Sequence, residues 1–182
     1  MKNKAIFLDR DGTINVDTNY VHKIEEWKFI DGVKEALKKL QELGFKLIVI
    51  SNQSGIGRGI FSKEENDILF KYMVSELEKD GIRIEKFYYC PHHNQNCECR
   101  KPKLGMFYEA AKEFDIDFSK SYAIRNKLRD VSICDKEPTR GFLLTKEKVE
   151  LKNPRITICE NLLEAAREVE KIEQESGGEN IG

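Results

Sequence analysis

The sequence predicts an α/β protein whose central parallel sheet has helices on both faces. Short apolar runs without polar alternation, such as residues 5–8 and 45–50, are typical of strands that are covered on both sides. Segments of helical period, residues 31–43 and 61–80 among them, separate these runs. Polar and acidic residues follow directly after the runs, at the strand ends where open α/β sheets bind ligands.

Length and composition fit one soluble domain. The chain has 182 residues, 35% of them charged and 40% hydrophobic, and a formal net charge of −1, which exerts no general attraction on nucleic acid or membrane. No apolar run approaches the roughly 20 residues of a membrane helix, and the N-terminus lacks the apolar segment of a signal peptide. We therefore expect a cytoplasmic monomer, with one domain over residues 1–173 and a disordered tail over residues 174–182, that binds neither nucleic acid nor membrane.

The first apolar run ends in two carboxylates. Asp9 and Asp11 lie two residues apart, and Gly12 lets the chain turn away sharply. A bare D-x-D is most simply a strand followed by an acidic turn, but the longer string D-x-D-G-T after an apolar strand is more specific. The irregular segment 16–29 then predicts a loop over the strand ends, in which we interpret His22 as a surface imidazole.

A second polar group follows the next strand. Residues 31–43 predict a packing helix with Asp31 and Gly44 as its caps, and residues 45–50 predict a buried strand. The segment that comes next combines a hydroxyl, two amides, glycines and an arginine: Ser51, Asn52, Gln53, Gly55, Gly57, Arg58 and Gly59. These groups suit an anion cradle, although Ser-Asn-Gln is also ordinary turn chemistry.

The third segment carries thiols and imidazoles. Residues 61–80 predict a helix with a capping box at Ser62 and Glu65, and residues 82–90 predict a strand. The pattern C-x-H-x4-C-x-C begins at the end of this strand. The pattern supplies four ligands for a tetrahedral Zn²⁺ site: Cys90, His92, Cys97 and Cys99. Because four protein ligands leave no open coordination position, such a zinc ion is structural. The alternatives to this interpretation are a zinc site with His93 in place of His92 and a redox-active thiol cluster. A disulfide across C-x-C is strained, which favours metal.

A basic turn follows the cysteines directly. Arg100, Lys101 and Lys103 indicate either a solvated turn or a set of phosphate contacts. The remaining pattern predicts a helix over residues 105–114, a strand over 121–124, edge strands over 141–145 and 156–159, and a last helix over 161–173. We expect Cys134 and Cys159 to be buried as small hydrophobic residues.

The combination of D-R-D-G-T-I-N, S-N-Q-S-G-I-G-R-G and C-P-H-H…C-x-C-R-K-P resembles the histidinol-phosphatase/heptose-bisphosphate-phosphatase branch of the haloacid dehalogenase-like (HAD) phosphohydrolases, over about residues 4–170. The resemblance implies a Rossmann-like HAD fold with a zinc-binding loop in place of a large cap. It also implies Mg²⁺-dependent hydrolysis of a small phosphorylated metabolite through an aspartyl-phosphate. We expect a D-glycero-D-manno-heptose 1,7-bisphosphate 7-phosphatase, with histidinol phosphate as the alternative substrate.

The resemblance also assigns roles to residues. Asp9 is the expected nucleophile, Asp11 the general acid/base, and Ser51 and Lys101 the groups that hold the phosphoryl oxygens. The expected substrate contacts are Asp17, Tyr20, Asn52, Gln53, Arg58, Arg100 and Lys127. The expected Mg²⁺ ligands are Asp9, Asp11 and Asn126.

The fourth motif departs from this family. Relatives follow the fourth strand with Gly-Asp-x-x-x-Asp, whereas this chain has Arg125 and Asn126 in the first two positions and keeps only Asp130. An amide oxygen coordinates Mg²⁺ without bringing a charge. Arg125 adds a positive charge that opposes the metal or partly stands in for it. A competing hypothesis is therefore a catalytically weakened phosphosugar-binding relative.

Overall fold

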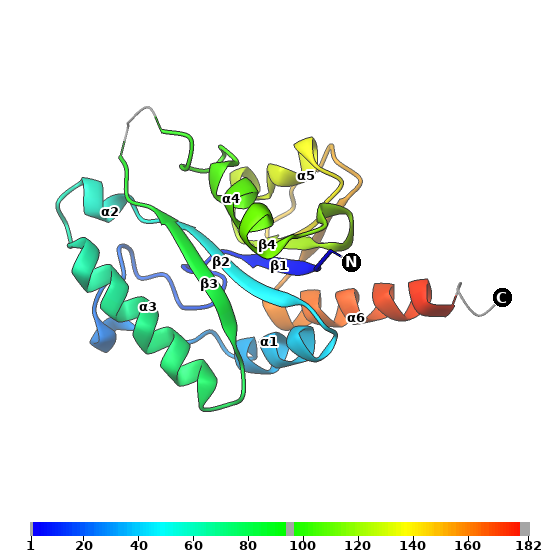
Figure 1. Cartoon of the computed structure of the whole chain (residues 1–182), viewed down its shortest axis with the longest axis horizontal. Coiled ribbons are helices and arrows are strands. Elements are labelled where there is room, and N and C mark those ends of the chain that lie inside the picture. Colours follow the sequence, from blue (N-terminus) through cyan, green and yellow to red (C-terminus); the bar gives the residue numbers. More distant parts are fainter. Residues whose placement is uncertain (1, 94–96, 179–182) are drawn as a thin grey trace.

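A six-stranded parallel sheet forms the centre of the protein (Figure 1). This computed structural model describes residues 2–93 and 97–178. The strands are β1 (Ala5–Leu8), β2 (Lys46–Asn52), β3 (Ile84–Cys90), β4 (Tyr122–Arg125), β5 (Arg140–Leu144) and β6 (Ile156–Cys159). Their order is β3-β2-β1-β4-β5-β6, and each neighbouring pair is parallel. β2 and β3 thus lie on one side of β1, and β4, β5 and β6 lie on the other. Open α/β sheets bind ligands at such a switch point in the strand order.

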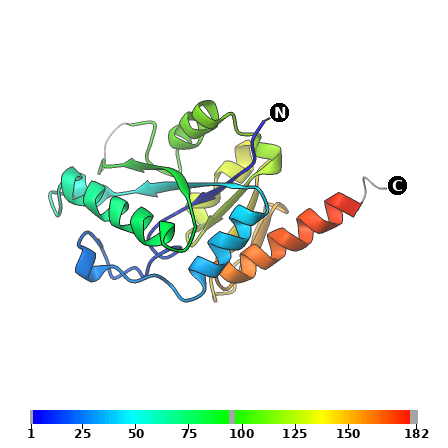
Figure 2. The same ribbon diagram turned by 60° about the horizontal axis from the view of Figure 1, so that its bottom comes forward.

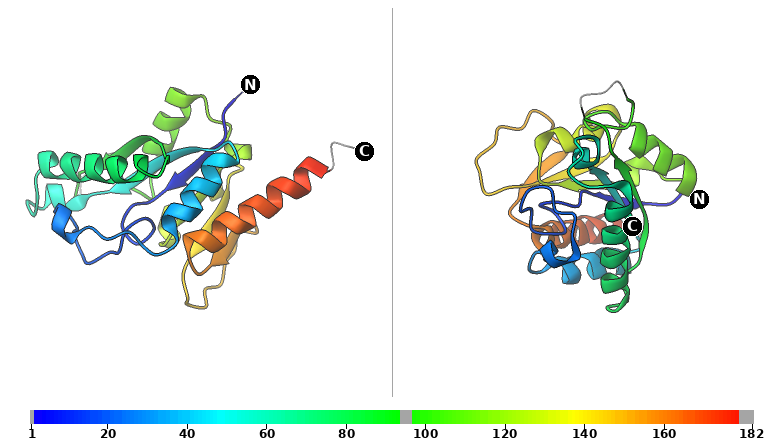
Figure 3. Two further views of the ribbon diagram at one scale, coloured as in Figure 1. Left: turned by 90° about the horizontal axis from the view of Figure 1, so that it is seen from below. Right: turned by 90° about the vertical axis from the view of Figure 1, so that its left-hand side faces the viewer.

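Helices cover both faces of the sheet, which confirms the predicted fold class. One face carries α1 (Val33–Glu42), α3 (Lys63–Glu78) and α6 (Leu162–Gly178), and the other carries α4 (Gly105–Phe114) and α5 (Ile133–Lys136) (Figures 1 and 2). A short helix, α2 (Ser54–Gly57), follows β2, and single 3₁₀ turns span Ile24–Glu26, Phe118–Lys120 and Leu128–Val131. Figure 3 shows α6 running beside α1 and extending past the sheet towards the C-terminus.

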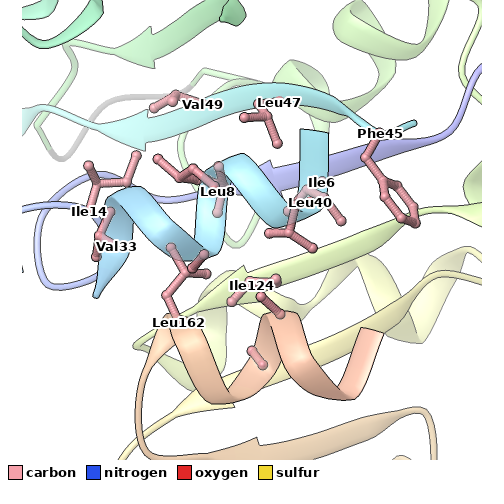
Figure 4. Packing of buried hydrophobic residues seen from close by; sticks show 14 of the residues in the cluster. Ile6, Leu8, Ile14, Val33, Leu40, Phe45, Leu47, Val49, Ile124 and Leu162 are labelled. Atoms are coloured by element: carbon pink, nitrogen blue, oxygen red, sulfur yellow. The ribbon is translucent and has the colours of Figure 1, made fainter. Parts of the chain in front are cut away.

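The apolar run of β1 is buried on both sides, as its lack of alternation predicts. Ile6 and Leu8 point into the core cluster beneath α1 and α6, while Ala5 and Phe7 point into the cluster beneath α4. All four side chains are 0% exposed. Figure 4 shows the first cluster, where Leu40 of α1 and Leu162 of α6 close over the strands. Since burying each such side chain contributes about 1.5–3 kcal/mol, the strand that carries Asp9 is firmly held.

Several element ends follow from local chemistry. The predicted capping box is confirmed, because Ser62 Oγ accepts a hydrogen bond from the Glu65 backbone N–H and Glu65 Oε1 accepts one from that of Ser62, both at 3.1 Å. Gly44 ends α1 with a φ of 94°, a conformation that glycine adopts without strain. The residue before α1 is Gly32, however, so the predicted cap at Asp31 is wrong.

Two other predictions need correction. Residues 141–145 do not form an edge strand, because β5 lies between β4 and β6. Its four apolar positions are buried on both faces, which is the pattern of an inner strand. The last helix continues to Gly178, five residues beyond its expected end, since residues 171–176 favour a helix and contain no proline. Of the expected tail, residues 179–182 lie outside the described residues.

In the part of the chain that the structure describes, the helices are too short or too polar for any of them to cross a membrane.

Candidate active site

A pocket with a volume of about 240 Å³ opens at the carboxyl ends of the central strands. It brings together predicted site residues from distant parts of the chain: Asp9, Asp11, Asp17, Tyr20, Asn52, Gln53, Arg58, Arg100, Lys101 and Lys127. The lining also includes Gly55 of the predicted anion cradle, Asp130 of the fourth motif, and three residues without a predicted role: Asn19, Ser54 and Arg129. Five cationic side chains and four carboxylates line the pocket, so it offers several charged donors to an anionic ligand.

Asp9 and Lys101 form the floor of the pocket. Asp9 directly follows β1 and is 7% exposed, and its Oδ1 accepts a hydrogen bond of 2.8 Å from the Arg10 backbone N–H. The Lys101 Nζ lies 3.3 Å from Asp9 Oδ1 and 3.4 Å from Asp130 Oδ2, and it donates to the Ile50 carbonyl at 3.1 Å. One ammonium group thus bridges two buried carboxylates.

This arrangement keeps Asp9 ionised. Burial by itself would raise the pKa of Asp9, but the positive charges of Lys101 and Arg125 outweigh it and hold that pKa well below its usual range. Burial raises the pKa of Asp130 and lowers that of Lys101. At neutral pH Asp9 is therefore a carboxylate.

Asp11 is held in place by several donors. Arg10 donates to Asp11 Oδ1 through Nε at 3.1 Å and through a terminal nitrogen at 3.0 Å. Gln53 Nε2 donates to Asp11 Oδ2 at 3.1 Å, and Asn15 Nδ2 donates to Oδ1 at 3.0 Å. Arg10 itself is 0% exposed and was not assigned to the site. Its position between two carboxylates at the end of a buried strand is the signal that would have identified it.

The two residues that end β2 have different positions. Ser51 is buried behind the pocket wall, where its Oγ accepts a hydrogen bond of 2.8 Å from Gln53 Nε2. Asn52 does line the pocket, and both of its amide atoms contact the backbone of Lys101. Its Oδ1 accepts from the Lys101 N–H at 3.0 Å, and its Nδ2 donates to the Lys101 carbonyl at 3.2 Å. Asn52 therefore fixes the segment that carries Lys101.

Asn126 lies against the turn that follows Asp11. A Cβ atom at Gly12 would lie 2.1 Å from Asn126 Nδ2, and Gly12 has a φ of 83°, so this position requires glycine. Asn126 Oδ1 is buried and accepts no hydrogen bond from the described residues. An unpartnered oxygen beside the Asp9–Gly12 turn is a donor of the kind that Mg²⁺ uses, so these residues fit a hard cation.

The predicted zinc ligands converge at the end of β3. The ligand atoms of Cys90, His92, Cys97 and Cys99 all lie within 4.8 Å of one another, and Cys90 Sγ is 3.2 Å from His92 Nδ1 and 3.8 Å from Cys97 Sγ. This grouping is compatible with a four-coordinate zinc site, and His93 does not belong to it. A hydrogen bond from the Arg100 backbone lowers the pKa of Cys97 to about 6, which favours the thiolate form that binds metal.

The cysteine cluster is joined to the pocket. Arg100, which lines the pocket, donates to the His92 carbonyl at 3.0 Å. Lys103 donates to the Cys97 carbonyl. The basic turn is therefore attached to the cluster rather than free in solvent. Arg100 and Lys101 line the pocket, whereas Lys103 is exposed outside it, and the predicted phosphate contacts stay a prediction.

Known proteins share both the sequence and the fold. The family model described as polynucleotide kinase 3 phosphatase matches residues 4–128. A D-glycero-beta-D-manno-heptose-1,7-bisphosphate 7-phosphatase from Haemophilus ducreyi is 47% identical over 154 residues, which cover 80% of this chain and 85% of that protein. The protein of the same name from Haemophilus influenzae is 46% identical over 136 residues, which cover 71% of this chain and 74% of that protein.

A solved structure extends the likeness to the fold. The crystal structure of D,D-heptose 1,7-bisphosphate phosphatase from B. bronchiseptica, complexed with magnesium and phosphate, has a TM-score of 0.84 and 26% identity. The match covers 93% of this chain and 99% of that chain. The chain therefore belongs to the HAD-type phosphoric monoester hydrolases, in the family that the polynucleotide kinase 3 phosphatase model describes and that includes the heptose 1,7-bisphosphate phosphatases.

Proposed function

We propose that this protein removes the 7-phosphate of D-glycero-D-manno-heptose 1,7-bisphosphate through an aspartyl-phosphate intermediate. The observation that carries the proposal is the ionised Asp9 carboxylate beside Lys101 on the floor of a cation-lined pocket. The names of the relatives from two Haemophilus species support the choice of substrate.

The chemistry takes place in two steps. An Asp9 carboxylate oxygen attacks phosphorus, the bond from phosphorus to the sugar oxygen breaks, and an acyl phosphate forms on Asp9. Asp11, held by Arg10 and Gln53, gives a proton to the leaving oxygen. Asp11 then takes a proton from the water that attacks the acyl phosphate, so phosphate leaves and Asp9 is regenerated. Lys101 stabilises the charge on the phosphoryl oxygens throughout.

The wall of the pocket suits a sugar with two phosphates. Arg58, Arg100 and Lys127 supply cations away from the floor for the second phosphate, and Asp17 supplies an acceptor for hydroxyl groups. Histidinol phosphate has one phosphate and a positively charged amine, so it would leave several of these cations without a counter-ion. This charge pattern favours the bisphosphate.

Two metal ions belong to the proposal. Asp9 and Asn126 would hold Mg²⁺, which when bound offsets the repulsion between the phosphate and the carboxylates. The Asp11 oxygens already accept hydrogen bonds from Arg10, Asn15 and Gln53, so they are less available to the metal than the oxygens of Asp9 and Asn126. Cys90, His92, Cys97 and Cys99 would hold a structural Zn²⁺, since four protein ligands leave no open position.

The proposal also includes the setting in which the enzyme works. A phosphorylated sugar is retained inside cells, so we propose a cytoplasmic enzyme. The pocket is formed within one chain, so we propose a monomer that needs no nucleic acid or membrane. Gel filtration with light scattering tests the oligomeric state, and a dimer would contradict that part.

A substrate comparison tests the function. Purified protein is given heptose 1,7-bisphosphate, histidinol phosphate or an aryl phosphate in separate reactions with Mg²⁺, and the products are followed by ³¹P NMR. We expect the signal of the 7-phosphate to be replaced by that of inorganic phosphate while the 1-phosphate signal remains. Faster turnover of histidinol phosphate would support the alternative substrate. Binding without turnover of any of the three would support the weakened relative.

A further inference from the structure

Arg125 is a charged side chain that lies entirely inside the protein, directly behind the pocket. It is 0% exposed. Because Leu8 of β1 pairs with Ile124 of β4, Arg125 is level with Asp9. One terminal nitrogen of Arg125 donates to the Ile50 carbonyl at 2.6 Å, the same carbonyl that accepts from Lys101. Two cations therefore meet at a single carbonyl beneath the reacting carboxylate.

The Arg125 guanidinium has fewer partners than a buried charge normally has. Its Nε and its second terminal nitrogen make no hydrogen bond with the described residues, and no carboxylate in the described part of the chain forms an ion pair with it. Its guanidinium carbon lies 5.0 Å from the centre of the Phe107 ring. A buried charge is costly unless nearby charges offset it. Asp9 and Asp130, which line the pocket, are the anions that do so here.

The buried charges are already balanced without a metal ion. Asp9 and Asp130 supply two negative charges, Lys101 and Arg125 supply two positive ones, and the third buried cation, Arg10, is paired with the partly exposed Asp11. With the Gly-Asp pair of the resembled family in place of Arg125 and Asn126, the same region would have one positive charge fewer and one negative charge more, so its net charge would be lower by two. That difference equals the charge of one divalent cation.

We infer that Arg125 is a positioning residue that provides part of the positive charge otherwise supplied by a divalent cation, so that the pocket binds a phosphate group without Mg²⁺ and binds Mg²⁺ weakly. The inference rests on the proposed function, because it takes the pocket to be the phosphate site. Arg125 does not touch the substrate, since it is fully buried behind Lys101. It acts by the field of a guanidinium that remains protonated at all working pH values.

Calorimetry with inorganic phosphate tests the inference without relying on turnover. Zinc-loaded protein is passed by gel filtration into Mg²⁺-free buffer, because a chelator would also remove zinc from the cysteine cluster. Phosphate affinity is then measured with and without millimolar Mg²⁺. We expect the parent to bind phosphate in both buffers, with affinities that differ by less than about threefold.

Three variants separate charge from packing. Arg125→Met keeps an apolar contact with Phe107 but loses the charge, so its Mg²⁺-free phosphate affinity falls about tenfold or more and Mg²⁺ restores it. Arg125→Lys keeps the charge and stays close to the parent. Asn126→Asp adds a negative charge beside the Asp9–Gly12 turn, so a direct titration with Mg²⁺ gives an affinity about tenfold higher or more.

The outcomes distinguish the inference from the proposed function. Phosphate binding by the parent only when Mg²⁺ is present overturns the inference and leaves the function standing. Mg²⁺-free binding by Arg125→Met at the affinity of the parent also overturns it. If the parent binds phosphate in neither buffer, both proposals fail. Thermal unfolding reports whether Arg125→Met is folded, and if it is not, Arg125→Lys and Asn126→Asp decide the question.

Discussion

Asn52→Ala tests whether the hold on Lys101 is needed for activity. The substitution removes two hydrogen bonds to the Lys101 backbone, of 3.0 and 3.2 Å. Each contributes about 0.5–1.5 kcal/mol, so we expect a loss of about 1–3 kcal/mol in the free energy of unfolding. The larger effect is on rate. Without these two hydrogen bonds Lys101 is displaced from Asp9, and a displacement of about 1 Å lowers kcat/KM about 100-fold.

A matched variant separates the two effects. Asn153 forms a similar set of bonds before β6, where its Oδ1 accepts from the Arg155 N–H at 2.9 Å and its Nδ2 donates to the Cys134 carbonyl at 2.9 Å and to Asp135 Oδ1 at 2.8 Å. Asn153→Ala should lose comparable stability in urea unfolding and keep the parent kcat/KM for an aryl phosphate. Equal losses of kcat/KM in the two variants, or full activity in Asn52→Ala, would refute the role of Asn52 in placing Lys101.

Three further predictions follow from the site. Asp9→Asn should abolish phosphate release, because an amide does not form the acyl phosphate, and release near the parent rate in a colorimetric phosphate assay would rule out Asp9 as nucleophile. Elemental analysis should find about one zinc per chain, and Cys99→Ser should raise KM more than it lowers kcat because Arg100 follows the cluster directly; fully active protein free of zinc would contradict this. Burial holds the pKa of Lys101 below its usual value, and the charge of Arg125 lowers it further. Phosphate binding should therefore weaken at alkaline pH as Lys101 loses its proton, and Arg125→Met should raise the pH at which this weakening occurs. Calorimetric titrations in which that pH is unchanged or lower in Arg125→Met would contradict the prediction.

Local sequence predicts the elements whose surroundings match their own pattern. The run from Ala5 to Leu8 contains no polar residue, and such a run is stable only between two layers, so both its strand and the carboxylates at its end are predictable. The zinc ligands are predictable because four soft ligands within ten residues have few other uses. In both cases the chemistry is contained in one short stretch of chain.

Features that depend on pairing between distant segments are not predictable in this way. An arginine usually indicates an exposed position, and Arg125 is buried only because β4 pairs with β1 and the Ile50 carbonyl lies next to it. The position of Ser51 behind the wall depends on which way the end of β2 faces. The inner position of β5 depends on the strand order of the whole sheet, which no local pattern contains.

The hydrogen bonds of Arg10 have a consequence for how substrate enters and leaves. Besides holding Asp11, this side chain donates to the Val21 carbonyl at 2.8 Å and to Asn66 Oδ1 of α3 at 3.3 Å. The His22 ring stacks on Phe61 with 5.1 Å between ring centres. Moving the loop over residues 16–29 outwards would separate the His22 and Phe61 rings and break the hydrogen bond from the buried Arg10 guanidinium to Val21. The loop is therefore held against the interior, and moving it away from the pocket would cost about 1.5–3 kcal/mol for the hydrogen bond from the charged Arg10 to Val21 alone.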